Sequence, residues 1–124
     1  MANILISPSK YVQGAGELKK LGEYAGVYGK KALVLISAGG QKRSGKLIED
    51  SFAAVEATME FATFNGECCK TEIQRLRGVM QASGCDMIIG VGGGKIFDTA
   101  KAVAYYEKTP VIICPTIAST DAPC

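Results

Sequence analysis

The sequence contains no histidine, and this absence restricts the kinds of site that the chain can build alone. Histidine is the most frequent metal ligand in proteins and the most frequent general base near neutral pH. A metal centre within these 124 residues would therefore have to rely on other groups. We expect no metal site built from this chain alone.

Cysteine is present without a recognisable framework. The count is odd, and no two cysteines stand in a CxxC pair; the positions are Cys68, Cys69, Cys85, Cys114 and Cys124. This pattern disfavours both a set of disulfides and a zinc knuckle. Free thiols fit a reducing compartment, so the sequence predicts a cytoplasmic protein.

Long apolar runs and a strong charge of either sign are also missing. No stretch of 18 apolar residues occurs, which excludes a membrane-spanning helix of ordinary length. The net charge of +2 gives no argument for binding nucleic acid or an anionic membrane. With 48% hydrophobic residues, the length and composition fit one globular domain with a real core.

Apolar runs of strand length alternate with segments of helical periodicity. The strand candidates are residues 4–7, 31–37, 58–64, 85–91 and 110–114. The helical candidates are residues 41–55, residues 71–82 and a segment after Gly94. This alternation is typical of parallel βαβ units. It predicts an α/β fold of the Rossmann-like, doubly wound kind, with a mostly parallel sheet and helices on both faces.

Three consecutive glycines, Gly92, Gly93 and Gly94, follow an apolar strand candidate directly and open a helical segment. Glycine without a Cβ lets backbone amides approach a ligand closely, and a helix start attracts anions. Lys95 adds a positive charge beside them. The pattern favours a pyrophosphate site, although a tight strand-to-helix turn that binds nothing is the simpler alternative.

Two other glycine-rich stretches compete with this one. In GGQKRSGKL, Gly40, Gly45 and Lys46 match GxxxxGK, but Leu47 stands where a P-loop needs a hydroxyl for magnesium. We therefore reject a P-loop and interpret the stretch as a basic loop, either solvated or lying along a dinucleotide. GAGELKKLG has a misplaced third glycine, and we reject it as a dinucleotide fingerprint.

The last ten residues, PTIASTDAPC, follow the final strand candidate. Thr116, Ser119 and Thr120 supply hydroxyls, and Asp121 supplies a carboxylate, at the carboxyl end of a strand. Ligands of open parallel sheets bind in the crevice beyond those ends. The stretch by itself fits a turn as well as a site, but its pairing with the glycine cluster favours a site.

Together, GVGGGKIFDTAKAVA and VIICPTIASTDAPC resemble the glycerol dehydrogenases of the iron-containing (group III) alcohol dehydrogenase superfamily, and the resemblance extends over essentially the whole chain. It implies NAD as cofactor, with Gly92–Gly94 and Lys95 on the pyrophosphate. It further implies Thr116 and Ser119 on the nucleotide and Asp121 beside a polyol substrate.

The chain departs from that family at Ser37, where members often carry an aspartate that holds the adenosine ribose. Serine can still bind a ribose hydroxyl but lacks the charge that repels a 2′-phosphate. We expect NAD, with NADP less excluded than usual. Zinc in the family is held by an aspartate and two histidines of a carboxyl-terminal helical domain, so its ligands and the catalytic residues are expected outside this chain.

We therefore expect residues 1–124 to be the amino-terminal NAD-binding domain of a longer, homo-oligomeric enzyme that oxidises glycerol to dihydroxyacetone, or a truncated product of its gene. Two alternatives stay open: a nucleotide-binding module without catalytic activity, and a non-catalytic domain that associates with itself.

Overall fold

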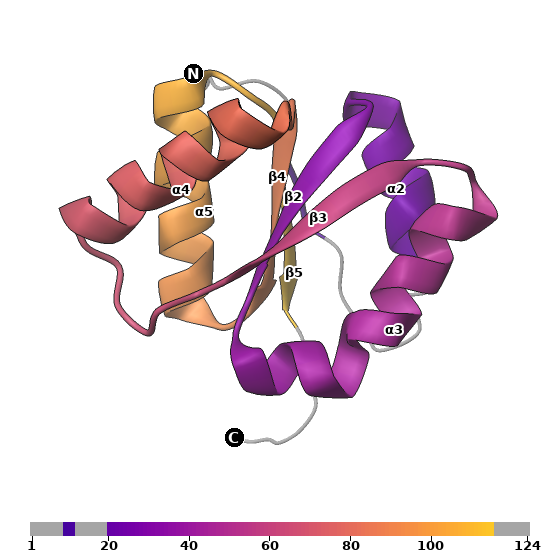
Figure 1. Cartoon of the computed structure of the whole chain (residues 1–124), viewed down its shortest axis with the longest axis horizontal. Coiled ribbons are helices and arrows are strands. Elements are labelled where there is room, and N and C mark those ends of the chain that lie inside the picture. The colour runs from indigo at the N-terminus through magenta and orange to yellow at the C-terminus, as the bar shows by residue number, and fades with distance from the viewer. Residues whose placement is uncertain (1–8, 12–19, 116–124) are drawn as a thin grey trace.

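The computed structural model describes residues 9–11 and 20–115, and its helices and strands carry the labels of Figure 1. In chain order they are β1 (Ser9–Tyr11), α2 (Leu21–Tyr28), β2 (Lys31–Ile36), α3 (Ala38–Ala54), β3 (Thr58–Thr63), α4 (Lys70–Ser83), β4 (Met87–Gly92), α5 (Gly94–Glu107) and β5 (Val111–Pro115). From β2 onward, strands and helices alternate as the sequence predicts.

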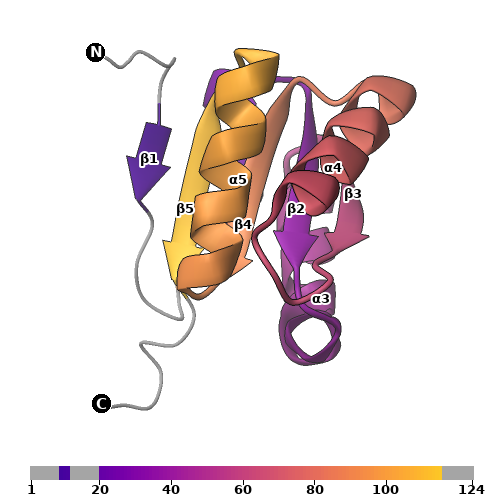
Figure 2. The same ribbon diagram turned by 90° about the vertical axis from the view of Figure 1, so that its left-hand side faces the viewer.

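The described strands form one five-stranded sheet in the order β1-β5-β4-β2-β3. Every neighbouring pair is parallel, and Figure 2 shows the strand arrows pointing the same way. The predicted α/β, Rossmann-like class is confirmed. The strand candidate at residues 4–7 lies outside the described residues.

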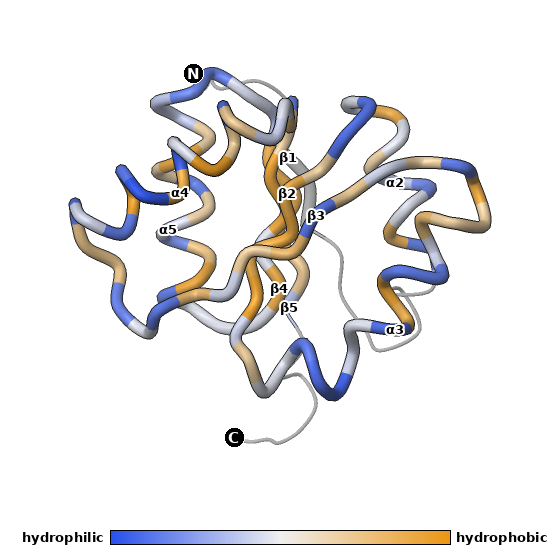
Figure 3. The backbone as a smooth tube through the Cα atoms, viewed as in Figure 1, coloured by the Kyte–Doolittle hydropathy of each residue, from blue (hydrophilic) through white to orange (hydrophobic). Residues whose placement is uncertain are grey.

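Helices cover both faces of the sheet, with α2 and α3 on one face and α4 and α5 on the other (Figure 1). Successive residues of β2 alternate between the two cores: Val34 belongs to the same core as Phe52 of α3, and Leu35 to the same core as Leu76 of α4. Because each face of the central strands is buried, these strands are apolar at nearly every position, and their tubes are mostly orange in Figure 3.

Two helices differ from the predictions. The sequence analysis did not predict α2, which contains Gly22 and Gly26. Yet a Cβ at Gly22 would collide with the carbonyl of Ser51, so this glycine allows α2 to pack closely on α3. Helix α3 begins at Ala38 rather than Gln41, because the Ser37 hydroxyl accepts the Gly40 N–H at 3.0 Å and caps the helix.

Candidate functional site

β2 and β4 are neighbours in the sheet, and the chain runs from them towards opposite edges. From β2 the chain passes through α3 to β3 on one side, and from β4 it passes through α5 to β5 on the other. Ile36 and Val91, near the carboxyl ends of β2 and β4, are register partners. In doubly wound sheets, ligands bind in the crevice at such a switch point. Ser37 and the Gly92–Gly94 cluster therefore come together at its rim.

Gly92 is required by the backbone itself. Its φ of +145° lies where residues with side chains are strained, and a Cβ there would lie 2.8 Å from Ile96 Cδ1. The residue ends β4 and turns the chain into α5. The bare-turn alternative therefore explains this first glycine.

Gly93 and Gly94 have neither a positive φ nor a close neighbour that would require glycine. Gly93 has φ −118°, which any residue adopts, and a Cβ at either position would meet no atom of the described residues within 4 Å. Glycine is thus required there neither by backbone conformation nor by packing within the described residues. An approaching ligand would benefit from the missing side chains. A tight turn therefore accounts for Gly92 but not for the glycines at positions 93 and 94.

The start of α5 supplies the donors for such a ligand. Gly93 is the N-cap and offers no side chain to the helix, and the Phe97 N–H makes the first helical bond, to the Gly93 carbonyl at 3.0 Å. The preceding amides at Gly94, Lys95 and Ile96 therefore have no partner within the helix. Together with the helix dipole they favour an anion at this end.

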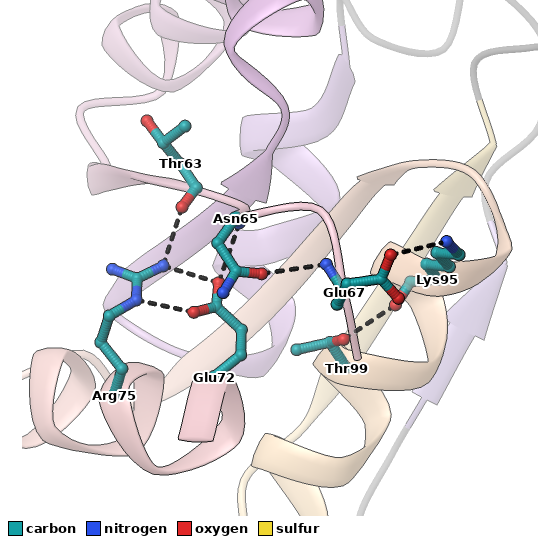
Figure 4. Close-up of polar contacts among 7 residues, drawn as sticks. All are labelled: Thr63, Asn65, Glu67, Glu72, Arg75, Lys95 and Thr99. Carbon is teal, nitrogen blue, oxygen red and sulfur yellow. Dashed lines mark hydrogen bonds and ion pairs between the residues drawn. The ribbon is translucent and has the colours of Figure 1, made fainter. Parts of the chain in front are cut away.

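Lys95, predicted to add charge here, forms an ion pair in the structure (Figure 4). Its ammonium donates to Glu67 Oε2 at 3.2 Å, from α5 to the loop between β3 and α4. The two side chains are 64% and 71% exposed, so solvent weakens the pair. The positive charge therefore lies at the helix start, as predicted, with a carboxylate beside it.

A buried carboxylate, Glu72, and its partner Arg75 join the two elements that flank the loop between β3 and α4. The Glu72 side chain is 1% exposed, and Arg75 donates to both of its oxygens at 2.7 Å. Arg75 also donates to the Thr63 carbonyl at 2.8 Å, which ties α4 to the end of β3 (Figure 4). The hydrogen bonds from Arg75 hold the pKa of the Glu72 carboxyl below its usual value, although burial acts in the opposite direction.

Ser37 lies at the other strand of the switch point. Its hydroxyl accepts the Gly40 N–H as the cap of α3, and the side chain is half-buried. The oxygen is therefore already used as an acceptor, while the hydroxyl proton can still be donated. If Ser37 contacts a ribose, it does so while it also caps α3.

The expectation of a basic loop at residues 39–47 is wrong. These residues lie within α3, which runs without interruption from Ala38 to Ala54. Two of its glycines have close neighbours: a Cβ at Gly40 would lie 3.0 Å from Ile36 Cγ1, and one at Gly45 would lie 3.1 Å from Gln41 Cγ. Lys46 pairs with Asp50 at 3.6 Å on the exposed side of the helix.

The predicted residues Thr116, Ser119 and Asp121 lie outside the described residues. The last described residue, Pro115, is the register partner of Gly92 on the neighbouring strand. Sequence reasoning missed Glu67 and Glu72. Only the spacing of Glu72 and Arg75, three apart on a helix, hinted at their pair.

The described residues contain a surface cavity of about 340 Å³ elsewhere in the molecule. Its lining includes Lys30 and Ala57, which directly precede β2 and β3, so it lies at the amino ends of the strands. That is the end of the sheet opposite to the switch point. Within the described part, no group of three or more Cys, Asp and Glu side chains is placed to hold a metal ion, and no helix is long and apolar enough to cross a bilayer.

The chain is similar in sequence and in structure to known dehydrogenases. The chain is 45% identical to the glycerol dehydrogenase of Escherichia coli and 46% identical to that of Thermotoga maritima, over its whole length and 34% of theirs. A crystal structure of a probable glycerol dehydrogenase from Sinorhizobium meliloti matches with a TM-score of 0.77 and 46% identity, over 94% of this chain and 31% of that one. The chain thus spans about a third of the length of these relatives. Residues 8–124 match the family described as iron-containing alcohol dehydrogenase, and the chain belongs to that family.

Proposed function

We propose that residues 1–124 are the NAD-binding domain of a dehydrogenase that oxidises glycerol to dihydroxyacetone. A closely related polyol would be oxidised to the corresponding ketone. The proposal is supported by the relatives named above, which are called glycerol dehydrogenases. The observation that carries the binding role is the open space at Gly93 and Gly94, where neither backbone nor packing calls for glycine.

In this proposal each residue at the switch point has a separate task. The turn at Gly92 directs the chain into α5, and the amides of Gly94 and Lys95 donate to pyrophosphate oxygens. The Lys95 ammonium adds a positive charge beside them. Ser37 contacts the adenosine ribose across the crevice, from the strand next to β4. Bound NAD would supply the acceptor for a hydride.

The remaining predicted contacts belong to the same proposal. Thr116 and Ser119 would contact the nucleotide, and Asp121 would face the substrate. No metal step is assigned to this chain, because it contains no histidine and its described residues form no ligand cluster. The family name points to iron and our expectation to zinc, and either ion would need ligands from outside this chain. A homo-oligomeric, cytoplasmic enzyme stays a prediction.

A binding titration tests the proposed role. NADH added to the purified chain should show a saturable change in fluorescence, and ADP-ribose should displace it because it carries the same pyrophosphate. Adenosine, which lacks phosphate, should displace NADH far less. If NADH produces no saturable signal, or if adenosine competes as well as ADP-ribose, the proposed pyrophosphate-binding role is wrong.

A further inference from the structure

The ion pair between Lys95 and Glu67 joins the proposed pyrophosphate site to a loop that carries no predicted role (Figure 4). Lys95 lies in the first turn of α5, directly after the two open glycines. Glu67 lies between β3 and α4 and is 28 residues away in sequence. A carboxylate thus lies 3.2 Å from the ammonium that would meet the pyrophosphate.

The backbone of Glu67 is held in place by a chain of hydrogen bonds. Its N–H donates to Asn65 Oδ1 at 3.0 Å, and the Asn65 N–H donates to Glu72 Oε2 at 3.1 Å. Glu72 is buried and is itself fixed by Arg75. The loop is therefore anchored on the buried carboxylate of Glu72, which the partly exposed Arg75 holds, and Glu67 extends towards α5 from a backbone that is hydrogen-bonded in place.

The other side of the pair is equally well anchored. Lys95 belongs to the helix that buries Ile96 and Ala100 in the core. Its carbonyl accepts the Thr99 hydroxyl at 2.8 Å, a contact drawn in Figure 4. With both backbones held, the side chains meet because the fold brings their positions together. Only the ends of two exposed side chains need to move to break the contact.

The Lys95 ammonium has two competing partners once a dinucleotide is present. The pyrophosphate carries negative charge and would lie against the backbone amides of Gly94 and Lys95, within reach of that ammonium. The carboxylate of Glu67 draws the ammonium away and also repels the phosphate through space. Because the pair is exposed, breaking it costs little, and the cost corresponds to a change of about 1.4- to 5-fold in a binding constant.

We propose that Glu67 holds Lys95 in the free domain and gives it up to the pyrophosphate when a dinucleotide binds, so that Glu67 weakens dinucleotide binding. The inference rests on the proposed function, because it needs a pyrophosphate at the start of α5. Glu67 is a positioning residue here: it acts on the ligand through Lys95 and through its own charge. Its presence favours release of the dinucleotide.

The variant Glu67→Gln tests this proposal, with Glu49→Gln as the matched control. Both changes remove one negative charge from an exposed side chain, and Glu49 lies on α3, away from the start of α5. The backbone N–H of residue 67 keeps its bond to Asn65, so the loop anchor is retained. The probes are ADP, which carries a pyrophosphate, and adenosine, which carries none.

Glu67→Gln should bind ADP about 1.4- to 5-fold more tightly than Glu49→Gln, in line with the energy of an exposed ion pair. Adenosine should bind both variants equally. The difference for ADP should shrink as salt rises from about 0.05 M to about 1 M, where the Debye length is about 3 Å. A merely structural role of Glu67 would produce neither the dependence on phosphate nor the dependence on salt.

Two failures can be told apart. If the parent chain binds ADP but Glu67→Gln matches Glu49→Gln, the pair is an ordinary surface contact and the inference is wrong while the proposed function stands. Equal strengthening of ADP and adenosine binding would also overturn it. If the parent binds neither ADP nor NADH, the proposed function fails and the inference falls with it.

Discussion

Replacing Gly93 by valine should weaken dinucleotide binding strongly while leaving the fold intact. Gly93 has φ −118°, and in the part of the chain that the structure describes a Cβ there would meet no atom within 4 Å. A Cβ at this position therefore causes neither backbone strain nor a close contact in the free domain, and we expect valine to be tolerated there. Its two methyl groups would instead occupy the space in which we place the pyrophosphate.

The expected magnitudes separate binding from stability. Valine is a poorer N-cap than glycine but also restricts the unfolded chain, so the free energy of unfolding should change by less than about 1 kcal/mol. Each lost hydrogen bond to a charged phosphate is worth about 1.5–3 kcal/mol, so NADH should bind at least about tenfold more weakly.

Two further variants complete the experiment. Gly26→Val also adds a side chain in open space, on α2, and should change NADH binding little. Gly92→Val should instead destabilise the fold, because its φ of +145° and its contact with Ile96 leave no room for a side chain. NADH fluorescence titration gives the affinities, and urea unfolding gives the stabilities. The reasoning is refuted if folded Gly93→Val binds NADH as tightly as Gly26→Val.

Three more outcomes follow from the same structure. Ser37→Asp should keep the cap of α3, since aspartate is a good N-cap, and should raise the preference for NAD over NADP in competition titrations; an unchanged ratio would place the ribose elsewhere. Glu72→Gln should lower the free energy of unfolding at neutral pH by about 1–3 kcal/mol. Because the folded-state pKa of Glu72 is lowered, the stabilisation that its carboxylate supplies is complete above the ordinary pKa of 4.5 and is lost as the pH falls below that value. The free energies of unfolding of parent and variant, measured in urea, should therefore converge in acid. A difference that stays constant with pH would contradict this. The isolated chain with added zinc, NAD and glycerol should show no NADH absorbance above a blank, and a glycerol-dependent rise that scales with chain concentration would show that the site is complete without histidine.

The central strands could be predicted because burial on both faces leaves a continuous apolar run, as in β2 and β4. The start of α5 could be predicted because Gly92–Gly94 separate that run from a helical pattern. Helix α2 could not, since Gly22 reads as a helix breaker in sequence and acts as a close contact with α3 in the fold.

The site was predictable only in part, for a related reason. Gly93, Gly94 and Lys95 are contiguous, so one motif contains them. The partner of Lys95 is 28 residues distant, and nothing local marks Glu67 as its neighbour. The register of β2 with β4 brings Ser37 near the glycine cluster, and the hydrogen bond from Asn65 to Glu72 fixes the loop that carries Glu67. Neither contact can be predicted from the local sequence.

Recording which backbone amides respond to NADH would test the proposed site at the level of single residues. In a nitrogen-15 NMR titration of the chain, the amides of Gly93, Gly94 and Lys95 should shift most, with Ser37 responding across the crevice. Gly26, which lines the cavity at the opposite end of the sheet, should not shift. Large shifts at Gly26 with none at Gly93–Lys95 would show that the dinucleotide binds elsewhere, and the assignment of this site would be wrong.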